Sequence, residues 1–194
     1  MIITGILGFL VFILICVGLG GASTTDENVI NCAWAQADIG NDFHSYVGLK
    51  RVVTQKGDNG DTTGANWEDC SGVGYCSDCE DAGDTTVNSI ALAFVLSIPI
   101  MVMTFLRTTN ARDLNLYKIL TLVLCFVSLL LFMIAMGEFG AGCYENLPSG
   151  DDYEYGPGFN AISACFVFEI FILVFHLLTP VKKSETPSDN YTAA

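Results

Sequence analysis

Charged residues are scarce in this chain, and basic residues are the scarcest. Only 15% of the 194 residues are charged, and eight Lys and Arg stand against 21 Asp and Glu, for a formal net charge of −13. So few basic residues argue against a nucleic-acid partner, because an acidic surface repels phosphate. An acidic disordered tail is also excluded, since 52% of the residues are hydrophobic and such tails contain few of them. Apolar and acidic residues must therefore lie in separate parts of the chain.

The chain also lacks the motifs of enzyme active sites. It has no grouped nucleophile, base and orienting residue, and no glycine-rich phosphate loop. The pair Cys76-x-x-Cys79 is the nearest approach to a zinc motif, but only Cys70 lies nearby and a matching second pair is missing. We therefore expect no enzymatic activity, no cofactor and no bound metal.

Four long apolar segments are present instead, at about residues 2–22, 88–106, 119–137 and 158–179. Each is long enough to cross a hydrocarbon core of about 30 Å. A spanning segment must satisfy its own backbone hydrogen bonds, so each is expected to be an α-helix. The fold class predicted is an all-α membrane protein, a single four-transmembrane-helix bundle in a lipid bilayer.

The first apolar segment has a second interpretation as a signal peptide, with Gly20–Ser23 as a small-residue cleavage region. The segment is longer than a usual signal-peptide core, and no basic residues precede it. In either case, residue 23 onward emerges on the far side of the membrane.

Basic residues set the expected orientation. Five of them lie beside two connections: Arg107, Arg112, Lys118, Lys182 and Lys183. By the positive-inside rule the connection 108–117 and the tail 180–194 are cytoplasmic, so both termini lie inside and loops 23–87 and 138–157 lie outside. These outer loops hold 17 acidic and three basic residues. We therefore expect a multi-pass protein of the plasma membrane with a strongly acidic outer face.

The outer loops also hold five of the eight cysteines: Cys32, Cys70, Cys76, Cys79 and Cys143. An oxidising outer compartment permits disulfides. Because five is odd, at most two bridges form within one chain, and the sequence leaves the pairing open.

The first outer loop contains strand signals. Phe43–Gln55 is rich in β-branched and aromatic residues, residues 31–39 are weaker, and turn residues follow at Lys56–Asp61. We expect a small antiparallel sheet pinned by disulfides. Four acidic residues then precede the second apolar segment, near the expected start of its helix, and are predicted to form an acidic outer surface: Asp78, Glu80, Asp81 and Asp84.

This arrangement resembles the claudin, peripheral myelin protein and epithelial membrane protein superfamily. The local matches are Tyr46-Val47-Gly48-Leu49, then Cys70 and Cys79, and Tyr155-Gly156-Pro157-Gly158-Phe159 at the last segment. The family signature is a Trp, then Gly-Leu-Trp, then two cysteines about ten residues apart, and Lys50 replaces the second Trp here. The resemblance implies a left-handed four-helix bundle with a sheet built mainly from the first loop, and a Cys70–Cys79 disulfide.

The resemblance also implies a structural or adhesion protein, forming homo-oligomers or contacts with another membrane protein through its outer loops or helices. The acidic outer sheet would mediate lateral or cell–cell contacts and favour cations near it. Two alternatives stay open: an auxiliary subunit of a membrane channel or receptor, and a self-contained ion channel or transporter using Glu169.

Glu169 is the single charge within the last apolar segment. A charge at a helix centre costs about 2.5–3.5 kcal/mol on insertion scales, so this side chain is expected to face the bundle. Helical spacing places Cys165 and His176 on the same face. Its candidate partners are Thr121, Ser128 and Ser97. An ion or proton path and a hydrogen bond between helices are both compatible with this pattern.

Overall fold

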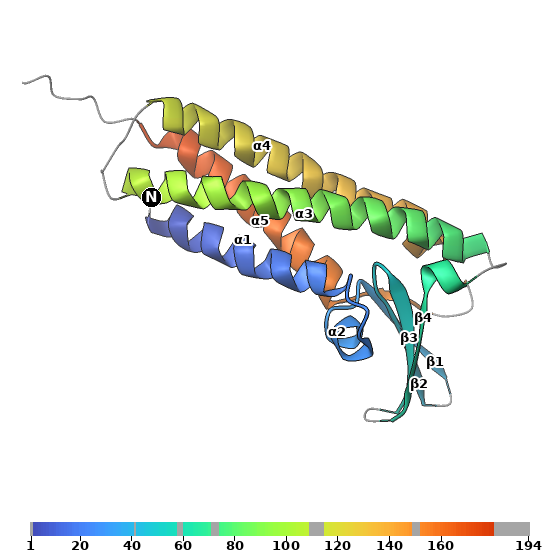
Figure 1. The fold of residues 1–194 in the computed structure, drawn as a ribbon. Coiled ribbons are helices and arrows are strands. Elements are labelled where there is room, and N and C mark those ends of the chain that lie inside the picture. The colour runs from blue at the N-terminus through green and yellow to red at the C-terminus, as the bar shows by residue number, and fades with distance from the viewer. Residues whose placement is uncertain are drawn as a thin grey trace, which may run out of the picture.

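The computed structural model describes residues 2–40, 42–57, 60–70, 74–108, 115–148 and 152–180. Four long helices form a bundle, and a small sheet projects from one end of it (Figure 1). The four helices are α1 (Ile2–Gly20), α3 (Gly74–Thr108), α4 (Asn115–Glu138) and α5 (Pro157–Leu178). We call the end with the sheet the sheet end, and the end where α1 begins the far end.

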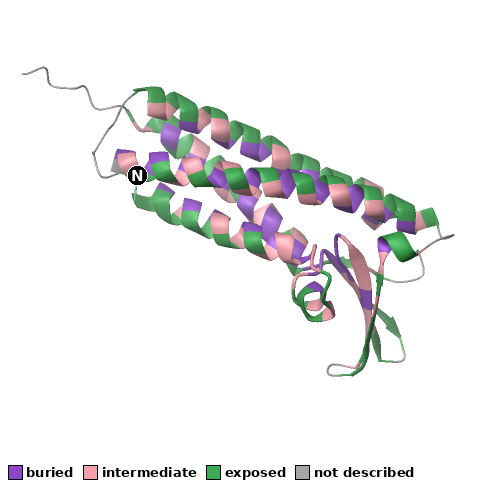
Figure 2. Cartoon of the chain, in the orientation of Figure 1, coloured by how far each residue is buried: buried purple, intermediate pink, exposed green. Residues whose placement is uncertain are grey.

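All four helices are long and apolar enough to cross a membrane. Their inner faces are buried and their outer faces are exposed along the whole bundle (Figure 2). Exposed side chains on these outer faces include large apolar ones on every helix, such as Phe9, Val95, Phe126 and Phe171. Such surface is stable only against lipid. The chain is therefore a multi-pass integral membrane protein, and the predicted four-helix bundle is confirmed.

Two helices extend beyond the apolar segments from which they were predicted. Helix α3 begins at Gly74 rather than near residue 88, and α4 continues into the π-helix η2 (Phe139–Cys143) and the 3₁₀-helix η3 (Tyr144–Asn146). Hydropathy finds only the part of a helix that lies in lipid. The extra turns are polar outside but bury Cys76, Cys79 and Ala82, so packing extends the helix beyond the apolar segment.

The sheet has five antiparallel strands in the order β4-β3-β2-β1-β5. Their bounds are Ala35–Gly40 for β1, Phe43–Val47 for β2, Arg51–Lys56 for β3, Thr62–Asn66 for β4 and Glu154–Tyr155 for β5. The predicted sheet is confirmed, and the strand-rich segment 43–55 contributes two strands to it, β2 and β3. The predicted turn at Lys56–Asp61 falls between β3 and β4, and its residues 58 and 59 lie outside the described part of the chain.

Strand β5 comes from the connection before α5, far along the chain from the other four strands. It pairs with the start of β1 through Ala35 opposite Tyr155 and Gln36 opposite Glu154. Two short helices complete this end of the molecule: α2 (Asp26–Asn31), which packs against β3, and the 3₁₀-helix η1 (Trp67–Asp69). The sheet is thus assembled from both long connections of the bundle.

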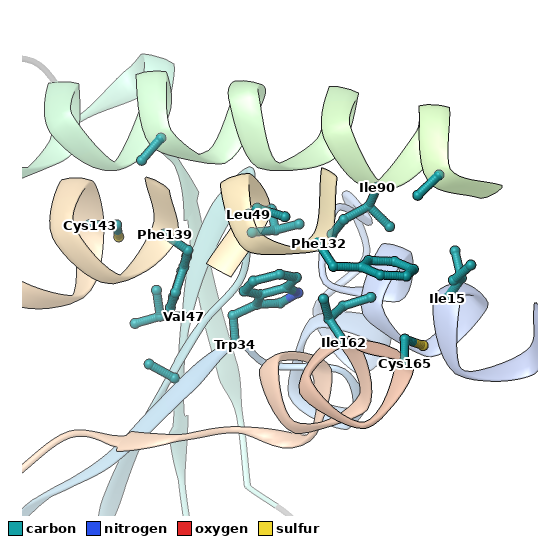
Figure 3. Close-up of a cluster of buried hydrophobic side chains, with 14 of the residues drawn as sticks. Ile15, Trp34, Val47, Leu49, Ile90, Phe132, Phe139, Cys143, Ile162 and Cys165 are labelled. Atoms are coloured by element: carbon teal, nitrogen blue, oxygen red, sulfur yellow. The ribbon is translucent and has the colours of Figure 1, made fainter. Parts of the chain in front are cut away.

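Trp34 joins the sheet to the bundle. Its side chain is fully buried, and its indole Nε1 donates a hydrogen bond of 2.9 Å to the carbonyl oxygen of Gly18 at the end of α1. Its ring packs edge-on against Phe139 and Phe159, with centroids 5.0 and 5.7 Å away. Figure 3 shows Trp34 between the strands and the helices, with Ile162 of α5 beside it. One side chain therefore contacts α1, η2 and α5 while standing at the start of β1.

The turn between β2 and β3 is inserted into the same junction. Leu49 is fully buried, and its N–H donates to the carbonyl oxygen of Gly21 at 2.7 Å. A Cβ on Gly48 would lie 2.6 Å from that same oxygen, and a Cβ on Gly83 of α3 would overlap the carbonyl oxygen of Leu49. These glycines are needed because backbone meets backbone with no room for a side chain.

Replacing Gly83 with alanine should therefore destabilise the protein, although alanine normally favours a helix over glycine by about 0.5–1 kcal/mol. Gly137→Ala is the matched control, because no atom of the described residues lies within 4 Å of the added methyl group. Thermal unfolding in detergent should show a lower melting temperature for the first variant only. Equal or higher melting temperatures for both would contradict the docking of the turn against α3.

Candidate functional site

The residues of the outer loops that were singled out from the sequence gather at the sheet end, where the turn between β2 and β3 meets α3. Gly48 and Leu49 are the buried part of this turn. Lys50, which replaces the tryptophan of the family signature, forms an ion pair with Asp84 of α3. The Nε1 of Trp67 donates to the carbonyl oxygen of Gly48 at 3.4 Å. The signature residues thus fix the sheet to the bundle and are not displayed on the surface.

Two disulfides pin this region, and the pairing implied by the family resemblance is wrong. Cys70 pairs with Cys76, and Cys79 pairs with Cys143. Cys70 lies just before α3 and so meets the first turns of that helix, where Cys76 lies. Cys79 lies one turn further along and faces η2, which carries Cys143. The second bridge therefore joins the two long connections.

The remaining cysteine of this region, Cys32, is free and half-buried. A Cβ on Gly20 would lie 2.6 Å from its sulfur, so the thiol packs closely over the end of α1. Burial raises the pKa of the Cys32 thiol above its ordinary value. Since the thiolate is the reactive form, this lowers its reactivity near neutral pH.

The four predicted acidic residues lie together on the first turns of α3, beginning one turn after its start. Asp78 and Asp81 are exposed, and Glu80 is half-buried. Asp84 is half-exposed, and its carboxylate is paired with the ammonium group of Lys50. The exposed members of this set carry negative charge on the side of α3, beside the sheet and not on it.

A second acidic surface was missed by the sequence analysis. A groove of about 370 Å³ on the sheet is lined by Asp38 and His44 from β1 and β2, and by Asp152 and Glu154 from the connection before α5. Nδ1 of His44 lies 2.5 Å from an Asp38 carboxylate oxygen. We call these four residues the acidic groove. It exists only because β5 pairs with β1, and nothing in either segment alone signals that pairing.

Glu169 lies inside the bundle, and only 1% of its surface is exposed. Ser128 and Cys125 of α4 face its carboxyl group, so one of the three expected partners is adjacent. The other two, Thr121 and Ser97, donate instead to backbone carbonyls of their own helices, Tyr117 and Phe94. Among the described residues, Oε2 of Glu169 and the hydroxyl of Ser128 have no hydrogen bond of good geometry.

His176 lies two helical turns from Glu169 and has different partners. Arg107 Nη1 donates to its Nδ1 at 2.8 Å, and its Nε2 lies 3.1 Å from the hydroxyl of Thr104. A guanidinium group can only donate, so Nδ1 accepts and Nε2 carries the proton toward Thr104. All three side chains are buried. Arg107 was used in the sequence only to orient the chain in the membrane. In the structure it belongs to a buried, hydrogen-bonded polar contact between α3 and α5.

No group of three or more His, Cys, Asp or Glu side chains in the described part of the chain is arranged to hold a metal ion. The fold and these sites define a four-helix membrane protein with a small antiparallel sheet and two disulfides at one end. No protein-family model and no curated protein sequence matches the chain. Experiments can probe three features of this structure: the two disulfides, the acidic surfaces and the buried Glu169.

The disulfide pairing predicts which thiol each cysteine substitution releases. In Cys79→Ser that is unfolded in denaturant without reductant, so that buried thiols become accessible, a maleimide should label Cys143 and leave Cys70 and Cys76 unlabelled, because these two remain bridged. In the control Cys70→Ser, the newly labelled residue should be Cys76. Peptide mapping by mass spectrometry reads out both variants. Release of Cys70 in Cys79→Ser would instead support the pairing implied by the family signature.

Substitution of Glu169 by glutamine should leave folding unchanged, because the amide keeps the size of the side chain and can hydrogen-bond to Ser128. We expect normal surface expression, an unchanged melting temperature and an unchanged membrane conductance. Ser128→Ala is the companion variant, since it removes the facing hydroxyl. A conductance that disappears in Glu169→Gln at normal surface expression would show that this carboxyl lines an ion path.

Proposed function

We propose that this chain is a claudin-like structural or adhesion protein whose acidic sheet makes lateral or cell–cell contacts at the plasma membrane. In this proposal the sheet end faces outward and both termini lie in the cytoplasm, as the basic residues beside the far end indicate. The protein acts through surfaces rather than through a reaction, alone in homo-oligomers or with another membrane protein.

The observation that carries the proposal is the shape and chemistry of the sheet. It stands clear of the bundle, attached through Trp34 at one end of β1 (Figure 1). Burial falls along β1 from Ala35, which is fully buried, to Ile39, which is 38% exposed. Phe43 at the start of β2 is 37% exposed. Exposed apolar side chains at the free end of an anchored sheet are typical of a contact surface.

The negative charge near the free end of the sheet, where Ile39 and Phe43 lie, supports a contact that favours cations over anions. The acidic groove lies on the same two strands as Ile39 and Phe43, with β5 beside them. Asp78 and Asp81 add exposed negative charge on the first turns of α3, at the same end of the molecule. A surface of one sign attracts cations and repels anions over a distance of about 8–10 Å at physiological salt. A space lined by such sheets would therefore favour cations.

The double variant Ile39→Ser, Phe43→Ser tests the contact surface. Fluorescently tagged protein, expressed in cells that do not otherwise adhere, should concentrate where two expressing cells touch. The double variant should reach the surface at the same level but lose most of this enrichment, because the apolar tip is gone. Ala65→Ser on the exposed edge strand β4 is the matched control and should behave like the unaltered chain.

Two results would contradict the proposal. One is enrichment at contacts that the double variant does not reduce. The other is purification of the protein in fixed stoichiometry with a large channel or receptor, without enrichment at contacts. The second result would favour the auxiliary-subunit alternative.

A further inference from the structure

The two disulfides at the sheet end differ in their exposure and in the length of chain that each one closes. Cys70–Cys76 joins residues six positions apart, whereas Cys79–Cys143 joins residues 64 positions apart. Of these four cysteines only Cys70 is half-buried, and the other three are buried. A reducing thiol must reach one sulfur of a bridge before it can break that bridge, so the two bridges differ in their access to reduction.

The Cys79–Cys143 bridge is protected by its surroundings. Both of its cysteines are buried, and it holds α3 against η2, so that it joins the two long connections of the chain. A bridge that closes a longer loop removes more freedom from the unfolded chain and stabilises the fold more. Reduction of this bridge therefore requires the surrounding structure to open.

The region around Cys70 has other contacts that hold it when its own bridge is broken. Trp67, in the 3₁₀-helix η1 just before Cys70, is 3% exposed. Its backbone N–H donates to the carbonyl oxygen of Lys50 at 3.1 Å, and its indole Nε1 donates to that of Gly48 at 3.4 Å. Lys50 is in turn paired with Asp84 of α3. The sheet therefore stays docked on α3 without the short bridge.

The first turn of α3 depends more strongly on the short bridge. Gly74 and Asp78 on this turn are exposed and Tyr75 is half-buried, and no atom of the described residues lies within 4 Å of a Cβ built on Gly74. Cys76 is the buried residue here, and its bond to Cys70 ties the turn to η1, which follows the edge strand β4. Opening this bond therefore frees the start of the helix and leaves the rest of α3 in place.

Negative charge lies beside the accessible end of the short bridge. Glu68 and Asp69 immediately precede Cys70 and are exposed. Lys50 borders the same pocket as Glu68, but its charge is paired with that of Asp84. An attacking thiolate is itself negative. The acidic surface therefore disfavours an anionic thiol such as glutathione and favours a thiol that carries a positive charge, such as cysteamine.

We propose that the Cys70–Cys76 bridge is a redox-sensitive clasp, which a neutral or cationic thiol opens while the rest of the protein stays folded. The thiolate of this reagent attacks Sγ of Cys70 and forms a mixed disulfide, and the electron pair of the broken S–S bond leaves with Cys76, which takes up a proton. A second thiol molecule attacks the reagent's sulfur in the mixed disulfide, so that Cys70 also becomes a thiol and the reagent leaves as its own disulfide. Closed, the clasp holds the start of α3 against η1, and open, it releases this turn. The clasp does not depend on the proposed function, because it involves neither the free end of the sheet nor the acidic groove.

Graded reduction of the folded, full-length protein in nanodiscs tests the clasp. The protein is equilibrated with increasing ratios of cysteamine to cystamine, the exchange is stopped with acid, and free thiols are alkylated after unfolding and mapped by mass spectrometry. We expect alkylation of Cys70 and Cys76 at a ratio at least about tenfold below that needed for Cys79 and Cys143. Relative to their rates with a small uncharged disulfide, glutathione should open the clasp several times more slowly than cysteamine, and added salt should reduce this difference.

Hydrogen exchange measures what the opening of the clasp does to the structure. At a cysteamine ratio that opens only the clasp, the amides of residues 68–70 and 74–78 should exchange severalfold faster, while those of residues 83–90 stay unchanged. The double variant Cys70→Ser, Cys76→Ser should show the same exchange pattern and a nearly unchanged melting temperature. The matched double variant Cys79→Ser, Cys143→Ser should melt at a much lower temperature. If a variant fails to fold, the titration of the unaltered protein still decides the question.

Three outcomes would overturn the proposal. Reduction of both bridges at the same cysteamine ratio would show that the short one does not open separately. Unchanged exchange at residues 68–70 and 74–78 after selective reduction would show that the bridge holds nothing in place. A free Cys143 thiol that appears together with Cys70 under mild reduction would show that Cys76 passes the reduction on to Cys79 within the Cys76-x-x-Cys79 motif.

Discussion

The hydrogen bond from the Trp34 indole to the carbonyl oxygen of Gly18 is the contact on which the arrangement of the two parts depends. A buried indole N–H without a partner would cost about 1–3 kcal/mol. The ring therefore lies at the end of α1, where the carbonyl oxygen of Gly18 accepts from the indole as well as from the N–H of Gly21. Phe139 and Phe159 then close around it from η2 and α5. Together with the docked turn between β2 and β3, this placement sets the direction in which the sheet leaves the bundle.

Much of the fold could be predicted from the sequence because the bilayer imposes a simple rule on the chain. A segment in lipid must be long, apolar and helical, and each of α1, α3, α4 and α5 satisfies that rule in its residues alone. Local strand and turn signals also located β2, β3 and the turn after Lys56. These features depend on residues that are close together in the sequence, so the sequence of one chain is enough to predict them.

The site was harder to predict, because it depends on contacts between distant segments. Cys143 bonds to Cys79, and Glu154 lies beside Gln36, only through the path of the chain around the bundle. Trp34 was also missed, although the family signature begins with a tryptophan and the chain contains only two.

The register of β5 has a consequence for the order of biosynthesis. Strand β1 is made soon after α1, but its edge is paired only when Glu154 and Tyr155 emerge, after α4 has entered the membrane. Cys79 likewise waits for Cys143. A nascent chain that stalls before this point carries an open edge on β1 and an unpaired Cys79, and both are absent from the finished protein. The pairing of β5 with β1 and the Cys79–Cys143 disulfide can therefore form only after α4, the third membrane-spanning helix, has been inserted.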